Sequence, residues 1–359
     1  MQGQNYELDF SGKEIYAGID VHLKTWKVSI MTNGLMCKTF SQSANAADLK
    51  KFLERNYPNA NYHSAYEAGF SGFSAHRELE KLGVSNIVVN PADVPTTDKE
   101  RRQKEDSRDS RKIVRSLYNN ELEAIHVPNI DIEGLRALVR YRKTVVKEIS
   151  RHKSRTKSFL YYHGIEIPEE LKIGSGHWSK PYSQWLQVLE FESEYSKQVL
   201  LQIIDTVEHL RKKLLEVNRK LRQLEKDSQY SEQIKLLRTV PGVALVTTMT
   251  ILTELNDMKR FKNIDRLCSY VGLVPRTDSS GEKDRTGGIT PRCNQQLRGM
   301  LIESAWIAIR HDPALMMKYG ELIKRMDPNK AIVNIAKRLL SRIRYVLLNK
   351  KAYVKGVVK

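Results

Sequence analysis

The first forty residues after the N-terminus carry short apolar runs separated by turn signals. Runs rich in β-branched and aromatic residues at 15–21, 26–32 and 35–40 predict three strands. The last two flank Asn33-Gly34, a dipeptide that favours a tight hairpin between antiparallel strands. The chain is therefore expected to begin with a three-stranded meander.

The pattern that follows alternates between helical and strand periodicity. It predicts a helix at 46–57, a strand at 62–67, a turn at 69–72 and a helix at 74–82. A strand at 85–90, stopped by Pro91, an exposed polar loop at 90–103 and a helix at 106–119 follow. Three strands, helix, strand, helix, strand, helix is the element order of the RNase-H-like α/β fold. We predict that fold for the N-terminal part of the chain.

A long helix is predicted from residue 132, and a segment rich in helix breakers follows it. Those breakers predict a loop or linker: Gly164, Pro168, Gly174, Gly176 and Pro181. Beyond them, apolar residues recur with alternating spacings of three and four: Leu200, Ile203, Val207, Leu210, Leu214, Val217, Leu221 and Leu224. A stripe of this kind suits a dimerising coiled coil, which we favour, or an antiparallel helix pair within one chain.

The remaining third of the chain has the pattern of a mainly helical domain. Val240-Pro-Gly-Val243 lies between two helical stretches within 236–273, which suits either a helix-hairpin-helix that contacts a phosphate or a plain interhelical turn. Residues 276–292 are rich in Gly, Ser and charge and predict a loop, whereas 294–310 and 330–348 predict helices. We expect domains at 1–130, 131–235 and 236–359.

Charge changes this picture because it identifies a class of partner. The 359 residues have an ordinary globular composition, with 40% hydrophobic and 28% charged residues, but a net charge of +18 and a pI of about 9.6. From Arg136 to Lys157 nine cations face one acid, Glu148, and residues 328–359 contain nine cations and no acid. Apolar residues interrupt both blocks, so they predict basic helix faces that bind a polyanion, nucleic acid above all.

The cysteines and the hydropathy of the chain indicate the cellular compartment in which the protein works. Cys37, Cys268 and Cys293 are isolated, which argues against a disulfide framework or a zinc site. His22 and His126 lack a second histidine at metal-binding spacing, so local hydrogen bonds are the expected role. No apolar run approaches the ~20 residues that span a bilayer, and a cytoplasmic protein without membrane contact is expected.

Four acids fall where the predicted fold would gather them. Asp20 ends the first strand, Glu67 ends the strand expected beside it, and Asp106 and Asp109 share one helical face at i and i+3. Oxygen ligands of this kind suit Mg²⁺ or Mn²⁺, and a pair of such ions can serve phosphoryl transfer. Singly, each acid is more simply a solvated surface charge. Cations near the pair fit either a phosphate-facing site or ordinary ion pairing on a surface helix: Lys99, Arg101, Arg102, Lys104, Arg108, Arg111, Lys112 and Arg115.

An ordered set of short motifs makes the chain resemble a known family, the DEDD transposases of the IS110 type, and the IS1111 branch in particular. The motifs are Tyr16-Ala-Gly-Ile-Asp20-Val-His22, Tyr66-Glu67-Ala-Gly69, Lys104-Glu105-Asp106-Ser-Arg-Asp109-Ser, Val240-Pro-Gly-Val243, Tyr270-Val-Gly-Leu-Val-Pro-Arg276 and Ser279-Ser280-Gly281. The resemblance implies a RuvC-like N-terminal domain, a coiled-coil insertion and a C-terminal transposase domain with a serine nucleophile. It also implies a non-coding bridge RNA that guides recognition of donor and target DNA.

Carried over by position, the resemblance makes Asp20, Glu67, Asp106 and Asp109 the metal ligands and Ser280 the nucleophile, with Ser279 as second choice. Two departures alter the local sequence. Glu105 adds a charge beside Asp106, and Glu282 replaces a glycine in the serine loop. A serine hydroxyl needs activation, and no histidine lies near Ser280 in the sequence. The metal cluster would supply that activation if the two domains, from one subunit or two, come together.

The expected nucleic-acid contacts come from the basic helix and from the serine loop. They are Arg136, Arg140, Lys143, Lys147, Arg151, Arg276, Lys283, Arg285 and Arg292. Trp26, Trp178, Trp185 and Trp306 are expected to pack in cores or linkers. We predict an Mg²⁺-dependent transposase that exchanges DNA strands through a serine-phosphate intermediate as a dimer or tetramer. The rival functions are a hydrolytic junction-resolving nuclease, in which water attacks, and a non-catalytic RNA-binding scaffold.

Overall fold

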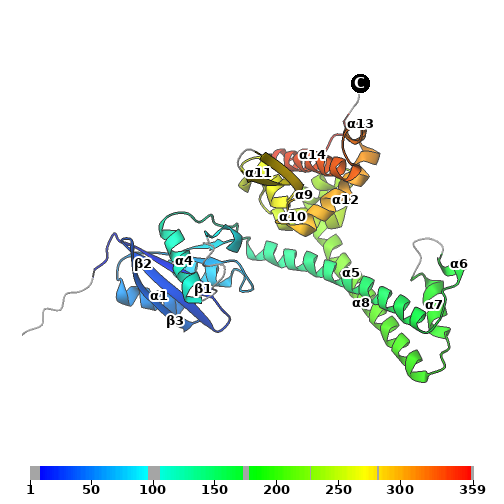
Figure 1. The fold of residues 1–359 in the computed structure, drawn as a ribbon, viewed down its shortest axis with the longest axis horizontal. Coiled ribbons are helices and arrows are strands. Elements are labelled where there is room, and N and C mark those ends of the chain that lie inside the picture. Colours follow the sequence, from blue (N-terminus) through cyan, green and yellow to red (C-terminus); the bar gives the residue numbers. More distant parts are fainter. Residues whose placement is uncertain (1–8, 96–105, 173–177, 227, 281–282, 357–359) are drawn as a thin grey trace, which may run out of the picture. The chain divides into compact units, whose positions relative to one another are not determined.

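The computed structural model describes residues 9–95, 106–172, 178–226, 228–280 and 283–356 (Figure 1). Contacts between residues divide the chain into two compact units, Met1–Pro128 and Asn129–Lys359. We call them unit 1 and unit 2 and describe each by itself.

Unit 1 is built on one five-stranded sheet with the order β3-β2-β1-β4-β5. The strands are β1 Glu14–Val21, β2 Thr25–Thr32, β3 Leu35–Ser43, β4 Asn61–Glu67 and β5 Ser85–Val89. β1 pairs antiparallel with β2 and parallel with β4, and β4 pairs parallel with β5. This mixed sheet confirms the predicted RNase-H-like fold class, and each strand lies where the hydrophobic pattern predicted it.

Helices cover both faces of this sheet. They are α1 Ala46–Asn56, α2 Ser74–Lys81, the short 3-10 helix η1 Pro91–Asp93 and α4 Asp106–Tyr118. Leu49 and Leu53 of α1 and Leu79 of α2 form one core with Ile15 and Ile19 of β1. α4 packs against β1 and β2. Residues 96–103 of the predicted exposed loop lie outside the described residues.

Gly18 determines how closely α4 approaches the sheet. A Cβ at this position of β1 would lie 2.3 Å from the carbonyl oxygen of Ser110 and 2.4 Å from the amide nitrogen of Val114, both in α4. No side chain larger than hydrogen fits at that separation. The glycine in the Tyr16-Ala-Gly-Ile-Asp20 motif therefore lets α4 lie directly on β1.

Unit 2 is mainly helical. Its helices are α5 Ile130–Tyr162, α6 Glu169–Lys172, α7 Lys180–Val188, α8 Glu194–Lys226, α9 Ser231–Arg238, α10 Leu245–Leu255, η2 Met258–Arg260, α11 Ile264–Val271, α12 Gln295–His311, α13 Pro313–Ile323 and α14 Pro328–Asn349. The predicted long helix and the two predicted C-terminal helices correspond to α5, α12 and α14. The second basic block is folded for most of its length, since α14 contains it as far as Asn349.

The apolar stripe of α8 packs within the chain. α5 and α8 lie against each other (Figure 1), and Arg142 of α5 donates to Asn218 of α8 at 2.8 Å. Leu200, Val207, Val217 and Leu221 of the stripe are buried. The stripe thus forms the intrachain helix pair that was the alternative to a dimerising coiled coil. Dimerisation through α8 stays a prediction.

The segment predicted as a loop or linker after α5 contains two short helices, α6 and α7. Trp178, Tyr182 and Leu186 form a small core there with Leu160 of α5 and Leu200 of α8. Pro181 occupies the first turn of α7, a position that favours proline because its missing amide hydrogen is not needed there. Trp26 is buried in unit 1 and Trp178 here, as predicted for core packing.

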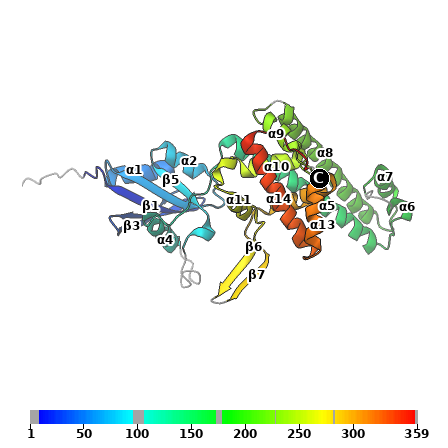
Figure 2. The same cartoon turned by 90° about the horizontal axis from the view of Figure 1, so that it is seen from above.

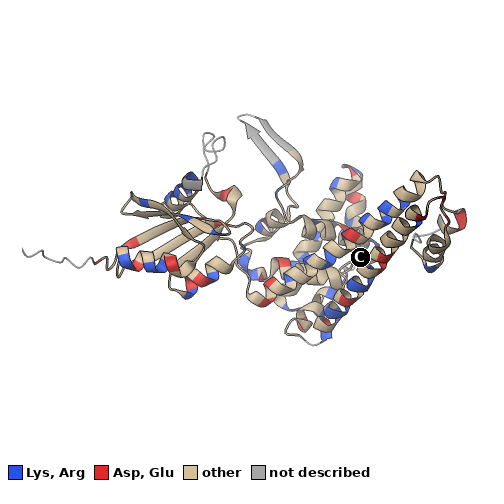
Figure 3. Cartoon of the chain, turned by 90° about the horizontal axis from the view of Figure 1, so that it is seen from below, with Lys and Arg blue, Asp and Glu red and all other residues tan. Residues whose placement is uncertain are grey.

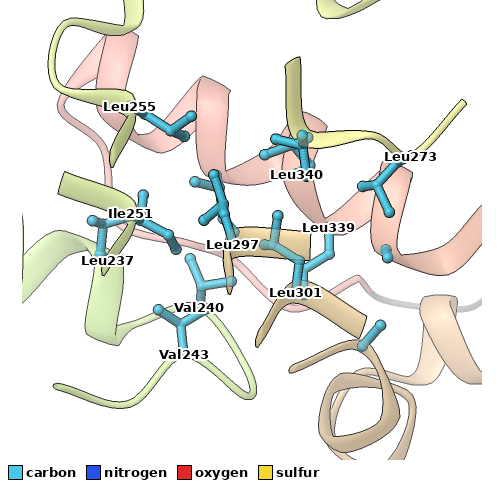
Figure 4. Packing of buried hydrophobic residues seen from close by; sticks show 14 of the residues in the cluster. Leu237, Val240, Val243, Ile251, Leu255, Leu273, Leu297, Leu301, Leu339 and Leu340 are labelled. Carbon is cyan, nitrogen blue, oxygen red and sulfur yellow. The ribbon is translucent and has the colours of Figure 1, made fainter. Parts of the chain in front are cut away.

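The main core of unit 2 joins α9 and α10 to α12 and α14. Leu237, Val240, Ile251, Leu301 and Leu339 belong to it (Figure 4). Gly242 has φ +78°, and a Cβ there would lie 2.3 Å from the carbonyl oxygen of Ser304 in α12. The Pro-Gly turn therefore has a packing role between helices. A phosphate contact at this turn stays a prediction.

The prediction of a loop at 276–292 is wrong. β6 Pro275–Ser280 and β7 Lys283–Ile289 pair antiparallel as a hairpin (Figure 2), with Ser280 opposite Lys283. These strands contain few apolar residues, so the sequence shows no alternation of buried and exposed positions. Backbone pairing between them satisfies their polar groups without such a pattern.

The predicted boundary between residues 235 and 236 falls inside unit 2, where Val139 of α5 and Leu221 of α8 share a core with Leu237 and later helices. The three-part division stays a prediction. In the part of the chain that the structure describes, none of the helices combines the length and apolar character needed to cross a bilayer.

Candidate functional site

Asp20 and Glu67 lie side by side at the carboxyl ends of neighbouring strands. β1 and β4 run parallel with Ile19 opposite Tyr66, so the next residue of each strand is an acid. Side chains alternate between the faces of a strand, and Ile19 and Tyr66 point into the core with α1 and α2. The two carboxylates therefore share the opposite face, on which α4 packs.

α4 contributes the other acids to that face. Its contact with Gly18 brings Ser110, and with it the preceding Asp109, over the strand that contains Asp20. The hydroxyl of Ser110 also hydrogen-bonds that of Ser29 on β2 at 2.9 Å. Asp106 begins α4, but its side chain is outside what the structure describes. The fold thus gathers Asp20, Glu67 and Asp109 on one face and leaves Asp106 untested.

Each described acid of this face has a basic neighbour. His22 Nε2 lies 3.1 Å from Asp20 Oδ2, which agrees with the local hydrogen bond expected for this histidine. Lys112 Nζ lies 3.5 Å from Glu67 Oε1 and 4.0 Å from Asp109 Oδ1. The acids remain accessible to solvent, with side chains 22%, 30% and 31% exposed for Asp20, Glu67 and Asp109. We call these three acids, with Lys112, the carboxylate face.

The donor chemistry of this face fits a divalent metal ion. Carboxylate oxygens are the ligands that Mg²⁺ and Mn²⁺ prefer, and Glu67 and Asp109 already have a cation, the Lys112 ammonium, between them. Among the described side chains, no three acids, histidines or cysteines are grouped closely enough to hold a metal as they stand. A metal site formed by Asp20, Glu67, Asp106 and Asp109 stays a prediction.

The proposed nucleophile lies at the end of the β6–β7 hairpin. Ser280 is the last residue of β6, and Ser279 pairs with Asp284 of β7. The side chains of both serines, Lys283 and Arg285 are outside the described part of the structure. Arg276 of β6 and Arg292, which follows β7, are exposed. The backbone therefore places both serines at the end of β6 and gives no reason to prefer one of them as the nucleophile.

Hydrogen bonds close the base of this hairpin and hold it to α12. The Thr290 amide donates to the Val274 carbonyl at 3.0 Å, and Arg298 of α12 donates to the Thr290 carbonyl at 2.6 Å. Asn294 caps the start of α12 by accepting from the Leu297 amide at 3.0 Å. The hairpin thus extends from a hydrogen-bonded base formed by Thr290, Asn294 and Arg298.

Glu254 of α10 links Asn294, at the base of the hairpin, to α5. Its side chain is 2% exposed and accepts two bonds from Arg140, from Nε at 2.8 Å and from Nη2 at 2.9 Å. The side-chain amide of Asn294 donates to the same carboxylate at 2.8 Å. Arg136 lies 3.9 Å away and donates to the Thr253 carbonyl at 2.9 Å. Glu254 is not among the residues predicted from the sequence, although an acid inside a strongly apolar helix is the signal of a buried charge.

These contacts divide the basic residues predicted to bind nucleic acid. Burial lowers the pKa of Arg136, against the opposing effect of the Glu254 charge, and the hydrogen bonds that Arg140 donates to Glu254 raise the pKa of Arg140. Both arginines thus lie against the buried Glu254, but the Arg136 side chain is 15% exposed whereas that of Arg140 is 56% exposed. Lys147 and Arg151 lie on the exposed side of α5, where Arg151 pairs with Glu148 at 3.1 Å. Lysines and arginines are spread along the helices of unit 2 among fewer acids (Figure 3).

Comparison with known proteins gives two family matches, one that covers most of unit 1 and the start of unit 2 and one that lies within unit 2. Residues 17–163 match a DEDD transposase model of the IS110 type, and residues 234–321 match the transposase IS116/IS110/IS902 family. The chain is 27% identical over 352 residues to "Putative transposase y4qE" of Sinorhizobium fredii, with 96% of this chain and 85% of that protein covered.

Two further relatives belong to named insertion sequences. The transposase of element IS1533 from Leptospira borgpetersenii is 27% identical, with 82% of this chain and 85% of the relative covered. The transposase of element IS1111A from Coxiella burnetii is 22% identical, with 77% and 75% covered. The chain belongs to the IS110/IS116/IS902 family of DEDD transposases.

Proposed function

We propose that this chain cuts and rejoins DNA at an insertion sequence through a serine-phosphate intermediate, with Mg²⁺ or Mn²⁺ held by Asp20, Glu67, Asp106 and Asp109. The observation that carries the proposal is the carboxylate face: the RNase-H-like sheet aligns Asp20 with Glu67, and Gly18 allows α4 to bring Asp109 to them. The acids of this face are partly exposed and can therefore meet a ligand, unlike Glu254.

The chemistry of the proposal is a pair of phosphoryl transfers. The Ser280 oxygen forms a bond to a DNA phosphorus while the bond from phosphorus to a sugar oxygen breaks, and that oxygen leaves with a proton. Attack by a sugar hydroxyl of another strand reverses the step and releases the serine, so strands are exchanged without net hydrolysis. A divalent metal bound by the carboxylates supplies stabilisation of negative charge on phosphate oxygens. Arg276, Lys283, Arg285 and Arg292 would bind the phosphates near the serine.

The partners in this proposal are donor and target DNA, a non-coding bridge RNA that specifies both, and further copies of the chain in a dimer or tetramer. The resemblance to the family and the net charge of +18 support them. Copurification of the chain with nucleic acid, followed by sequencing of what is bound, tests the RNA. Light scattering of the purified complex tests the assembly.

The activity is tested with Asp20→Asn on a supercoiled donor and target pair. Strand exchange is expected to disappear while nucleic-acid affinity changes little, because an amide oxygen lacks the charge of a metal ligand. Exchange at the wild-type level in Mg²⁺ would contradict the metal site. Hydrolytic cutting without exchange in the wild-type protein would favour the junction-resolving nuclease, and function that survives chelation would favour the RNA-binding scaffold.

A further inference from the structure

Lys112 differs from its cationic neighbours on α4. Arg111 and Arg115 are exposed, and Arg111 donates to the Thr39 hydroxyl of β3 at 3.1 Å. The Lys112 side chain is 14% exposed and turns toward the sheet, where its ammonium lies between Glu67 and Asp109. A lysine this well covered loses hydration, so the two carboxylates must compensate its charge.

The compensation is mutual. Glu67 ends β4 and Asp109 belongs to α4, and both approach one ammonium, at 3.5 and 4.0 Å. Without a cation between them, two carboxylates on one face would repel each other and disfavour the packing of α4 on the sheet. Lys112 therefore supplies the positive charge at the position where the proposed function requires a metal.

We propose that Lys112 is the resident counter-cation of the carboxylate face, and that a divalent metal ion must displace its ammonium to bind Glu67 and Asp109. This inference rests on the proposed function and adds a control of metal affinity to it. One positively charged group competes with another for the same oxygens, so the lysine keeps the site folded without metal and weakens metal binding.

Direct measurement of Mn²⁺ binding to the full chain, stripped with chelator, tests the competition. Lys112→Gln and Lys112→Met remove the competing charge, and we expect them to bind Mn²⁺ about five- to tenfold more tightly than the wild-type chain. Lys112→Arg keeps the charge and is expected to stay within about twofold of wild type. Arg115→Gln removes a cation from the exposed side of the same helix and serves as the matched control, with affinity unchanged.

Titration by electron paramagnetic resonance reads bound Mn²⁺ without any need for activity, and thermal unfolding checks that each variant is folded. Equal or weaker binding by both neutral variants, with Glu67→Gln still abolishing binding, would overturn the counter-cation while the metal-dependent function stands. No Mn²⁺ binding by the folded wild-type chain would overturn the metal site and the counter-cation together. Tightening by Arg115→Gln as large as that by Lys112→Gln would reduce the effect to net charge and also overturn it.

Discussion

Carboxylates in the two units have basic partners, yet they differ in burial and in how fully their oxygens are used. On the carboxylate face of unit 1, the acids are between 22% and 31% exposed, and the Lys112 ammonium lies 3.5 Å from Glu67 Oε1. In unit 2, Glu254 is 2% exposed and both of its oxygens accept bonds at 2.8 to 2.9 Å.

Asp312 of unit 2 follows the same rule as Glu254. It is buried, caps α13 through the Leu315 amide at 3.0 Å, and accepts from Arg342 at 3.0 Å and from the Tyr353 hydroxyl. A buried carboxylate whose two oxygens both accept short hydrogen bonds stabilises the fold and is closed to a ligand. A partly exposed carboxylate can exchange its partner more readily, and this difference supports the proposal that a metal binds in unit 1.

The largest effect on stability is expected from Glu254→Ala. The change leaves Arg136 and part of Arg140 without a compensating charge and the Asn294 amide without an acceptor, at a cost of about 3 kcal/mol. Glu67→Ala is the matched change in unit 1 and is expected to cost under about 1 kcal/mol. Urea unfolding of both variants measures the contrast. Similar costs would break the distinction between the two units.

The second largest effect on stability is expected from Gly18→Ala. The added methyl group must push α4 away from β1, which we expect to cost about 2 kcal/mol and to separate Asp109 from Asp20. Gly69→Ala is the control, since a Cβ there meets no heavy atom within 4 Å. Unfolding curves give the stability, and Mn²⁺ titration reports whether the face is intact. A stable Gly18→Ala chain with normal Mn²⁺ affinity would show that close approach of α4 is not needed.

Alkaline pH tests the buried network of unit 2. Burial is the main cause, and the hydrogen bond to Asp312 the second cause, that raises the pKa of Tyr353 to about 12. The folded chain thus keeps this tyrosine neutral while the unfolded chain ionises near pH 10, so its contribution is complete below pH 10 and is lost as pH rises toward 12. Tyr353→Phe should remove about 1 kcal/mol of the stability loss between pH 9 and pH 11.

Tyr182 provides the control for that measurement, because burial raises its pKa to about 12 as well, in a different core. Tyr182→Phe should remove a separate share of the alkaline loss, and the two changes should add. On the acid side the sign reverses. Burial alone would raise the pKa of Asp312, but hydrogen bonds from Tyr353, Leu315 and Gly356 and the charge of Arg342 lower it, so its contribution is lost as pH falls below 3.8.

The smallest effect concerns the exposed cations of α5. Removing one phosphate contact should flatten the plot of log affinity against log salt by about 0.9 on duplex DNA. Lys147→Ala and Arg151→Ala are each expected to do so, because both side chains are exposed. Arg136→Ala should leave the slope unchanged and lower stability instead. Equal slopes for all three variants and the wild type would mean that this side of α5 does not meet DNA.

The sheet of unit 1 was predictable because its strands are short apolar runs rich in β-branched and aromatic residues, and its turns have strong signals. The alignment of Asp20 with Glu67 followed from the fold, since two parallel neighbours end at one edge. The β6–β7 hairpin was not predictable, because polar strands show no periodicity. The partner of Arg140 was also hidden: Glu254 lies 114 positions away, and only tertiary packing brings the two together.

The roles of Lys112 and of the α8 stripe show a related limit. Eight cations surround the acidic pair in the sequence, and nothing in their spacing shows that Lys112 turns toward Glu67. A stripe at coiled-coil spacing suits a partner within the chain as well as one outside it, and the long antiparallel helix α5 supplies the former. In both cases the sequence shows which type of residue is present, a cation or an apolar stripe, and the fold determines which residue or helix it contacts.

Mapping of a covalent protein-DNA adduct tests the central claim most directly. A suicide DNA substrate traps the intermediate, and mass spectrometry locates the modified peptide. We expect phosphate on Ser280, its loss in Ser280→Ala, and only weaker trapping in Ser279→Ala, because the residue before Gly281 matches the family position and a following glycine allows close approach of a phosphate. Asp20→Asn should bind the substrate without forming the adduct. Phosphate on Ser279 would refute the choice of serine, and cutting by Ser280→Ala without any adduct would contradict the serine mechanism.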